Sequence, residues 1–316
     1  MIDRASRPPL AGRPWFAMTA WLLKLLLAMS MMTAAGQVYC EILVTDDSGR
    51  AVRLAQPARR IITLAPHIVE MLFAAGAGDR IVGAVEYSYF PEAAKSIARI
   101  GDSAQLDLER IVALKPDLII VWQHGNAQRQ LDRLLKLGIS VYYNEPRGLA
   151  DIARSIEQFG RLSGSESVAL PAARNFLRRE AELRARYSGR ASVRVFYQIW
   201  ENPLMTVSGE HIISDMLRLC GAENVFAGLK QLAPVISTEA VLAADPEAIG
   251  GATAEVNTSG KLDNWKKWPR MLAVARDNLF VIHTDLISRH TPRMLDGAQT
   301  MCEQIDAARG KRPKTR

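Results

Sequence analysis

Apolar and polar positions alternate along EILVTDDSGRAVRL (residues 41–54), on both sides of the turn residues Asp47, Ser48 and Gly49. This period of two predicts a β-hairpin, which we place in an N-terminal segment of residues 37–58. From residue 59 onward, short apolar runs such as RIITLAP and DLIIVW alternate with amphipathic helical stretches. Strands and helices that alternate at this spacing predict βαβ units around a parallel sheet.

The alternation is interrupted once. Residues 149–189 hold two helical patterns, LADIARSIEQFGRLSG and VALPAARNFLRREAELRARY, and no strand pattern. Strands and helices then alternate again in residues 190–308, with runs such as VRVFYQIW, PLMTVSG and NLFVIHTD. We therefore predict an α/β fold with two Rossmann-like lobes, residues 59–148 and 190–308, which contain small parallel sheets and are joined by a long helical connector.

One pattern occurs once in each lobe. LDLERIVALKPDLII (residues 106–120) aligns with ISTEAVLAADPEAIG (residues 236–250), so that Glu109 meets Glu239. Each stretch predicts a capped helix, a proline turn and an apolar strand. A glutamate in the first turn stabilises a helix by about 0.3–1 kcal/mol through the helix dipole. Dipole stabilisation does not require a glutamate at the same position in both lobes. The match of Glu109 with Glu239 therefore also indicates a feature that the protein needs twice.

The formal charge of +7 lies at the two ends of the chain. Residues 1–36 carry a net +3 and residues 309–316 a net +5, which leaves −1 of the total for the body between them. The body therefore has no electrostatic footprint for a nucleic acid. We expect residues 309–316 to form a solvated basic tail.

Residues 1–36 have the pattern of a signal peptide. Basic residues precede the apolar run LLLAMSMMTAA, which is too short to span about 30 Å of hydrocarbon, and small residues follow it. Cleavage near Gly36 would export the protein to an oxidising compartment; an uncleaved anchor is the alternative. Cys220 and Cys302, both in helical patterns, are then candidates for a disulfide, and Cys40 is left over.

The common catalytic motifs are absent from the sequence. It contains no G-x-S-x-G nucleophile elbow, no P-loop and no H-E-x-x-H. A metal site built from His67, Glu210, His211 and Asp285 is an alternative, but each is more simply explained as a helix-end or surface residue. We therefore expect neither an enzyme nor a metal or other cofactor.

Polar and aromatic residues follow the ends of several predicted strands, where open α/β sheets bind ligands. They are Tyr87, Trp122, Trp200, Asp285 and Arg289. Any one of them could be a packing residue. Together, broad rings with polar partners predict a site for a large planar ligand that carries amide or carboxyl groups.

Four segments around these residues resemble a known family. They are LERIVALKPDLIIVWQHGNAQRQ, RVFYQIWENP, LCGAENVF and DLISRHTPR. The family is that of the class III periplasmic substrate-binding proteins, which serve ABC importers of vitamin B12, haem and iron chelates. The resemblance covers nearly all of residues 59–308 and is strongest to the members that bind cobalamin.

The resemblance implies roles for individual residues. The family's cleft tyrosine, tryptophan and aspartate fall on Tyr87, Trp122 and Asp285, and its inter-helix disulfide falls on Cys220 and Cys302.

The resemblance also implies a reason for the repeated helix. Glu109 and Glu239 match the surface glutamates with which each lobe of such proteins docks on arginines of one of two identical permease subunits. A two-fold partner needs the same feature twice.

Three further aromatic positions of the cobalamin-binding members fall on Ser103, Met205 and Ala233. Met205 can still pack against a flat macrocycle, and Trp200 is an additional aromatic that can compensate for the others. We expect a periplasmic component of an ABC importer that binds a corrinoid, namely cobalamin, between its lobes. Asp285 and Arg289 would form hydrogen bonds with the amide groups at the rim of the corrin ring.

The expected partners are a permease homodimer and its ATPase subunits, so that contact with the inner membrane is peripheral and goes through the permease. The helical connector predicts small lobe movements.

The alternative to a corrinoid carrier is a haem or ferric-siderophore carrier. Haem-binding relatives carry an axial tyrosine where this chain has Asp102, so Tyr87 or His124 would have to replace it.

Overall fold

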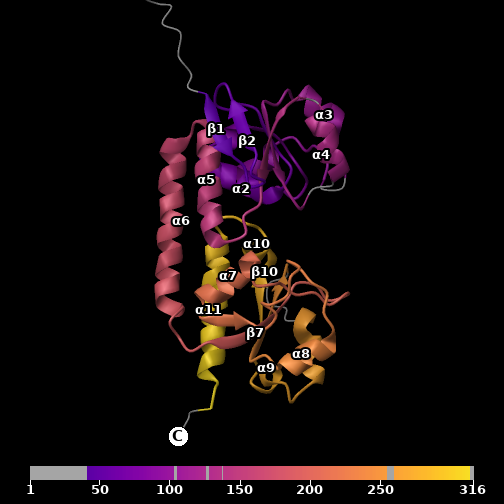
Figure 1. Cartoon of the computed structure of the whole chain (residues 1–316), viewed down its shortest axis with the longest axis vertical. Coiled ribbons are helices and arrows are strands. Elements are labelled where there is room, and N and C mark those ends of the chain that lie inside the picture. The colour runs from indigo at the N-terminus through magenta and orange to yellow at the C-terminus, as the bar shows by residue number, and fades with distance from the viewer. Residues whose placement is uncertain (1–40, 103–104, 126–127, 137, 255–259, 314–316) are drawn as a thin grey trace, which may run out of the picture. The chain divides into compact units, whose positions relative to one another are not determined.

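The computed structural model describes residues 41–313 except 103–104, 126–127, 137 and 255–259 (Figure 1). The predicted leader, Cys40 and Ser103 lie outside the described residues. Within the described ranges, no helix combines the length and the apolar character that a membrane crossing requires.

The predicted N-terminal hairpin is present. Strands β1 (Ile42–Thr45) and β2 (Ala51–Leu54) pair antiparallel. The Asp46 carboxylate closes the turn, because its Oδ1 accepts hydrogen bonds from the backbone amides of Ser48 and Arg50 at 3.0 and 2.9 Å. The turn also reaches the N-terminal lobe, since Asp47 Oδ2 accepts from the Glu145 amide at 2.6 Å.

The N-terminal lobe contains a parallel sheet in the order β4-β3-β5-β6. Its strands are β3 (Ile61–Thr63), β4 (Ile81–Ala84), β5 (Leu118–Trp122) and β6 (Ser140–Asn144). The connections contain the helices α2 (Pro66–Ala74), α3 (Leu108–Ala113) and α4 (Gln128–Leu135) and the 3-10 segments η1 (Gly78–Arg80) and η2 (Glu92–Ser96). The residues of β3 and the first four of β5 are buried, which explains their continuous apolar runs.

The C-terminal lobe repeats this arrangement, with the parallel order β8-β7-β9-β10. Its strands are β7 (Val193–Gln198), β8 (Ala222–Asn224), β9 (Ala248–Thr253) and β10 (Leu279–His283). Its helices and 3-10 segment are α7 (Ile212–Leu219), α8 (Thr238–Ala244), η3 (Gly260–Lys267), α9 (Leu272–Ala275), α10 (Thr284–Ile287) and α11 (Met294–Gly310). The two lobes therefore share one strand order as well as one sequence pattern.

An arginine at the start of the first strand makes equivalent bonds in both lobes. The side chain of Arg60 donates to the carbonyl oxygens of Leu114 and Lys115, in the turn between α3 and β5. The side chain of Arg194 donates to those of Ala244 and Asp245, in the turn between α8 and β9. Lys115 and Asp245 both have positive φ, of 45° and 41°. The sequence repeat is thus a repeat of atomic contacts.

One predicted strand of the C-terminal lobe is absent from the described structure. PLMTVSG forms no strand, and Met205 makes only isolated bridges to Trp200 and Val235. The segment pairs with a loop instead of a sheet: the amides of Thr206 and Ser208 donate to the carbonyl oxygens of Pro234 and Leu232, at 3.1 and 3.0 Å.

The predicted connector is a pair of helices, α5 (Leu149–Ser163) and α6 (Glu166–Tyr187), which lie side by side (Figure 1). A Cβ at Gly160 would come within 2.3 Å of the Ala169 Cβ, so glycine is needed where the two helices meet. Gly164, with φ of 65°, ends α5 in the left-handed conformation. One continuous hydrophobic core includes residues of both sheets, of α5, α6 and of α11.

The disulfide between Cys220 and Cys302 is confirmed. It joins the end of α7 to α11, with a Cα–Cα distance of 4.6 Å.

The expectation of a solvated basic tail does not hold for its described part. Helix α11 extends to Gly310, Arg309 donates to the Cys220 and Gly221 carbonyl oxygens, and Arg312 binds Glu247 at 2.6 Å. These cations are bound because α11 ends against carbonyl groups and a carboxylate of the C-terminal lobe.

Candidate ligand-binding site

Two large aromatic side chains are unusually exposed, one in each lobe. Tyr87 is 65% exposed and follows β4, and Trp200 is 61% exposed and follows β7. Burial of an aromatic side chain normally contributes to the core, so rings left in water at the carboxyl ends of parallel strands mark a candidate ligand site.

Tyr87 lies in an aromatic group of the N-terminal lobe. Its ring centroid is 6.2 Å from that of Tyr89, and Tyr89 and Phe90 are themselves 47% and 46% exposed. The backbone of Tyr87 is left-handed, with φ of 65°, which is uncommon for a bulky residue. A contact that holds this backbone is therefore important for the position of the ring.

A buried carboxylate joins the lobes beside this group. Glu70 on α2 has a side chain only 2% exposed, and it accepts two hydrogen bonds from Arg293, at 2.9 and 2.8 Å. Arg289 approaches the same carboxylate at 3.5 Å and binds Asp285 through Nε at 2.9 Å. The Arg293 guanidinium also lies 4.0 Å from the centroid of the Phe90 ring.

Trp122, at the end of β5, lies against two histidines. Its ring centroid is 5.3 Å from that of His67 and 6.1 Å from that of His290. Trp122, His290 and Ile199 line a cavity of about 220 Å3 whose other walls come from both lobes. Those walls are Glu145, Pro146, Arg147, Glu210, His211, Ile212, Ile213, Leu232, Ile287 and Ser288.

The histidines of this region are held neutral by their surroundings. Burial lowers the pKa of His290 and of His211 to about 4, and His211 adds to the effect on His290. Burial also lowers the pKa of His67 well below its usual value, with further contributions from His290 and Arg289. Near neutral pH these side chains therefore offer polar nitrogens without positive charge.

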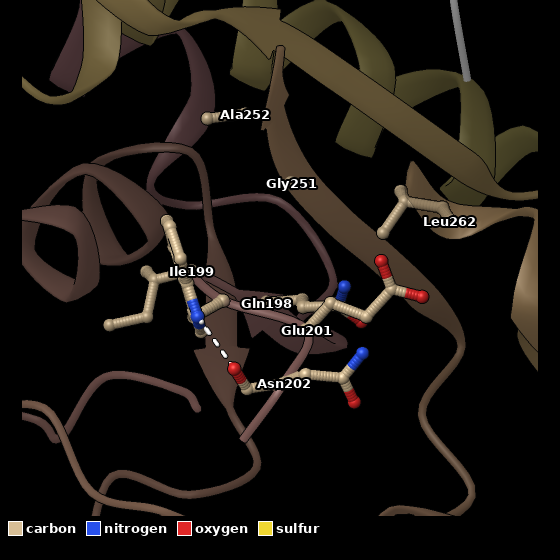
Figure 2. Close-up of a pocket in the computed structure, with 8 residues that line it drawn as sticks. Gln198, Ile199, Glu201, Asn202, Gly251, Ala252 and Leu262 are labelled. Carbon is tan, nitrogen blue, oxygen red and sulfur yellow. Dashed lines mark hydrogen bonds between the residues drawn. The ribbon is translucent and has the colours of Figure 1, made fainter. Parts of the chain in front are cut away.

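Trp200 lies beside a second cavity of about 270 Å3, at the ends of β7 and β9 (Figure 2). Its indole Nε1 donates to the Asn202 carbonyl oxygen at 2.9 Å, marked by the dashed line in Figure 2. Met205 is its neighbour, because the Met205 amide donates to the Trp200 carbonyl oxygen at 3.0 Å. Ile199 lines both cavities, so the cavities adjoin.

The two repeated glutamates lie on the surface of their lobes. Glu109 and Glu239 are exposed in the first turns of α3 and α8, behind the caps Asp107 and Ser237. Hydrogen bonds from its own backbone amide and from Ser237 lower the pKa of Glu239. Its carboxylate is therefore ionised at neutral pH.

Comparison with known proteins places the chain in a family. Residues 61–286 match the family model described as periplasmic binding protein. The chain belongs to the periplasmic binding protein family. Its members named below are binding proteins, and this chain is likewise a binding protein and not an enzyme.

Several relatives that are more than 30% identical to this chain are vitamin B12-binding proteins. The vitamin B12-binding protein of Vibrio parahaemolyticus is 36% identical over 81% of this chain and 93% of its own length. That of Yersinia pestis is 36% identical over 79% of this chain and 88% of its own length. The crystal structure of the periplasmic vitamin B12 binding protein BtuF of Vibrio cholerae superposes with a TM-score of 0.72, at 35% identity, over 80% of this chain and 98% of that one.

The alternative metal site does not assemble among the described residues. His211 Nδ1 accepts a hydrogen bond from the Ile213 amide at 3.1 Å and so caps α7. In the part of the chain that the structure describes, no three His, Cys, Asp or Glu side chains are grouped to hold a metal.

Some residues around the site are not evident from the sequence pattern. They are Glu70, Arg293 and His290, which complete the surroundings of Tyr87 and Trp122. One signal was present: Glu70 is an acidic residue inside the apolar helix HIVEMLFAA. A charge in the buried part of a helix normally has a partner, which here comes from the other lobe.

Proposed function

We propose that this protein is the periplasmic component of an ABC importer and that it binds a corrinoid, vitamin B12, between its lobes. The similarity to vitamin B12-binding proteins over most of their length supports the proposal. The single structural observation that carries it is the exposure of Tyr87 and Trp200 at strand ends of opposite lobes. Exposed ring faces suit a flat macrocycle, whose burial would stabilise the complex.

Each predicted site residue has a role in this proposal. Tyr87, Trp122 and Trp200 offer ring surfaces, and Met205 extends the surface beside Trp200. The Asp285 side chain is 39% exposed and can accept hydrogen bonds from carboxamides of the corrin rim. Arg289 is 21% exposed and is already bound to Asp285 and Glu70, so its contribution to the rim is secondary to its role between the lobes.

Delivery would use the repeated helices. Glu109 and Glu239 are exposed carboxylates at equivalent positions of equivalent lobes, which suits a permease with two-fold symmetry. The hydrophobic core shared by both lobes and the connector favours small lobe movements on binding.

Titration of the purified protein tests the proposal. Cyanocobalamin should quench tryptophan fluorescence in a saturable manner, and calorimetry should give one site per chain. Haemin, added in a parallel titration, should produce no saturable Soret shift. Binding of haemin alone would establish the haem carrier instead, and no binding of either tetrapyrrole would refute the proposed ligand class.

A further inference from the structure

His124 is the one exposed histidine of this chain. All five histidines lie in the described residues, and the other four are partly or fully buried. Two of those four cap helices, since His211 and His283 each accept a hydrogen bond from a backbone amide through Nδ1. The His124 side chain, in contrast, is 61% exposed. Its imidazole is therefore accessible to a bound molecule.

The turn at the end of β5 places His124 beside Trp122. The Gly125 amide donates to the Trp122 carbonyl oxygen at 3.3 Å, which closes the turn. A Cβ at Gly125 would come within 1.8 Å of the Trp122 indole, so glycine is needed for the turn to pack on the ring. Trp122 lines the cavity between the lobes. His124 therefore lies at the edge of the region in which we expect the ligand.

A buried carboxylate holds both the backbone and the ring of His124. Glu145 Oε2 accepts a hydrogen bond from the His124 amide at 3.2 Å and lies 3.3 Å from His124 Nδ1. The Glu145 side chain is only 6% exposed, and its own amide donates to Asp47 Oδ2 at 2.6 Å. The N-terminal hairpin thus fixes Glu145, and Glu145 fixes His124.

This pairing gives the two ring nitrogens different roles. An ionised carboxylate only accepts hydrogen bonds, so in the neutral imidazole the proton lies on Nδ1 and the lone pair on Nε2. Within the described residues, the contacts of His124 with Glu145 use its amide and Nδ1, not Nε2. Histidines that bind metals typically have such a carboxylate partner, which orients the ring and raises its basicity. An exposed imidazole with this support favours a metal as the ligand of Nε2.

We propose that His124 Nε2 is an axial ligand of the cobalt in corrinoids whose own axial ligand is exchangeable. With aquacobalamin, the bond between cobalt(III) and water breaks, the water leaves, and the Nε2 lone pair forms a bond to cobalt without transfer of electrons. The firmly bound cyanide of cyanocobalamin stays in place. This inference rests on the proposed function, and it adds that the protein prefers corrinoids with a weakly bound axial ligand.

Visible absorption spectra test the bond directly. Aquacobalamin bound to the wild-type protein should show the spectrum of the imidazole complex, for which a mixture of aquacobalamin and free imidazole is the reference. Aquacobalamin bound to His124→Ala should keep the spectrum of the water complex. Cyanocobalamin should keep its own spectrum with both proteins. An unchanged spectrum of aquacobalamin on saturation of the wild-type protein would overturn the proposal.

Calorimetry measures how much the bond contributes to affinity. His124→Ala and His124→Gln should each weaken aquacobalamin binding by at least about tenfold relative to cyanocobalamin binding, because neither side chain offers a nitrogen lone pair. Glu145→Gln retains an acceptor oxygen but removes the charge, and it should lower the same ratio by about tenfold. An equal loss for both corrinoids in the His124 variants would overturn coordination, because His124 would then contact the ligand without binding its metal.

Gln123→Ala is the matched control. Gln123 lies in the same turn, and its backbone amide donates to the Asn144 carbonyl oxygen at 3.3 Å. The variant should change neither the spectrum nor the ratio of affinities, and thermal melting should show that all variants fold. Effects equal to those of His124→Ala would assign the result to the turn and overturn the role of His124. Failure of the wild-type protein to bind either corrinoid would instead refute the proposed function, and this inference with it.

Discussion

Arg289 Nη1 lies 3.1 Å from the backbone carbonyl oxygen of Tyr87, so a side chain of the C-terminal lobe holds the backbone that carries an exposed ring of the N-terminal lobe. Tyr87 has a left-handed backbone, and Arg289 is itself fixed by Asp285 at 2.9 Å. The position of the Tyr87 ring therefore depends on the contact between the lobes.

A double-mutant cycle measures this dependence. Arg289→Ala should weaken cyanocobalamin binding by about tenfold, because the Tyr87 backbone loses its partner. In a Tyr87→Ala background the same change should have little further effect, since the positioned ring is already absent. Calorimetry on the wild type, the two single variants and the double variant gives the coupling free energy between the two residues. Additive losses would show that Arg289 contacts the ligand directly, and Arg289→Lys, which retains a donor, should restore part of the affinity.

Glu70 is expected to be a major contributor to stability. Its carboxylate is buried and accepts from Arg293 at 2.9 and 2.8 Å. Glu70→Ala leaves two arginines without a buried partner, and loss of one member of a buried ion pair costs about 3–5 kcal/mol. Urea unfolding followed by circular dichroism should show this decrease in the free energy of unfolding. Glu182→Ala, which removes an exposed partner of Arg178 on α6, is the control and should cost less than about 1 kcal/mol.

The free energy of unfolding should decrease when the pH is lowered, because buried histidines become protonated on unfolding. Burial lowers the pKa of His290 and His211 to about 4 in the folded protein, whereas an unfolded histidine titrates near about 6.5. Between these values the unfolded chain binds more protons. The free energy of unfolding therefore decreases as the pH falls from about 6.5 to about 4, by about 1.4 kcal/mol per pH unit for each histidine.

Urea titrations at pH 7, 5.5 and 4.5 measure this slope. Because carboxylates also contribute at the lowest pH, the informative quantity is the difference between wild type and His290→Gln. The variant should lose less stability over the same range. Parallel pH profiles for the two proteins would contradict the assignment of the effect to His290.

The disulfide should stabilise the C-terminal lobe. Cys220 and Cys302 are both completely buried and close a loop with a sequence separation of 82. Removal of a native disulfide typically costs 2–5 kcal/mol in small secreted domains, and a loop of this length agrees with about 4 kcal/mol. The Cys220→Ala/Cys302→Ala double variant should unfold at lower urea concentration. Addition of a reductant should lower the midpoint of the wild type but not that of the variant.

The repeated glutamates should act in delivery and not in ligand binding. Glu109→Lys combined with Glu239→Lys reverses two exposed charges that lie outside both cavities. We expect loss of corrinoid uptake in cells that depend on this protein, with calorimetric affinity for cyanocobalamin unchanged. Glu223→Lys, an exposed position on β8, is the control for charge reversal. Normal uptake by the double variant would exclude the docking role.

Local features of the fold could be predicted because they depend on neighbours in the sequence. The caps at Asp107 and Ser237 accept hydrogen bonds from the amides three residues later, as their spacing predicted. The apolar runs became buried parallel strands, and the strandless stretch became α5 and α6. The wrong expectation of a strand at PLMTVSG came from the same reasoning, since apolar residues there pair with a loop that lies about 30 residues later in the chain.

The sequence by itself determined two lobes with one repeated pattern, aromatic residues at strand ends and two cysteines as candidates for a disulfide. Tertiary structure alone decided which of these groups face solvent, a cavity or another charge. Arg289 donates to the Tyr87 carbonyl oxygen, Glu70 binds Arg289 and Arg293 of the opposite lobe, and the described end of the basic tail binds Glu247. These outcomes depend on where distant segments meet, and residue order contains that information only through the packing of the whole chain.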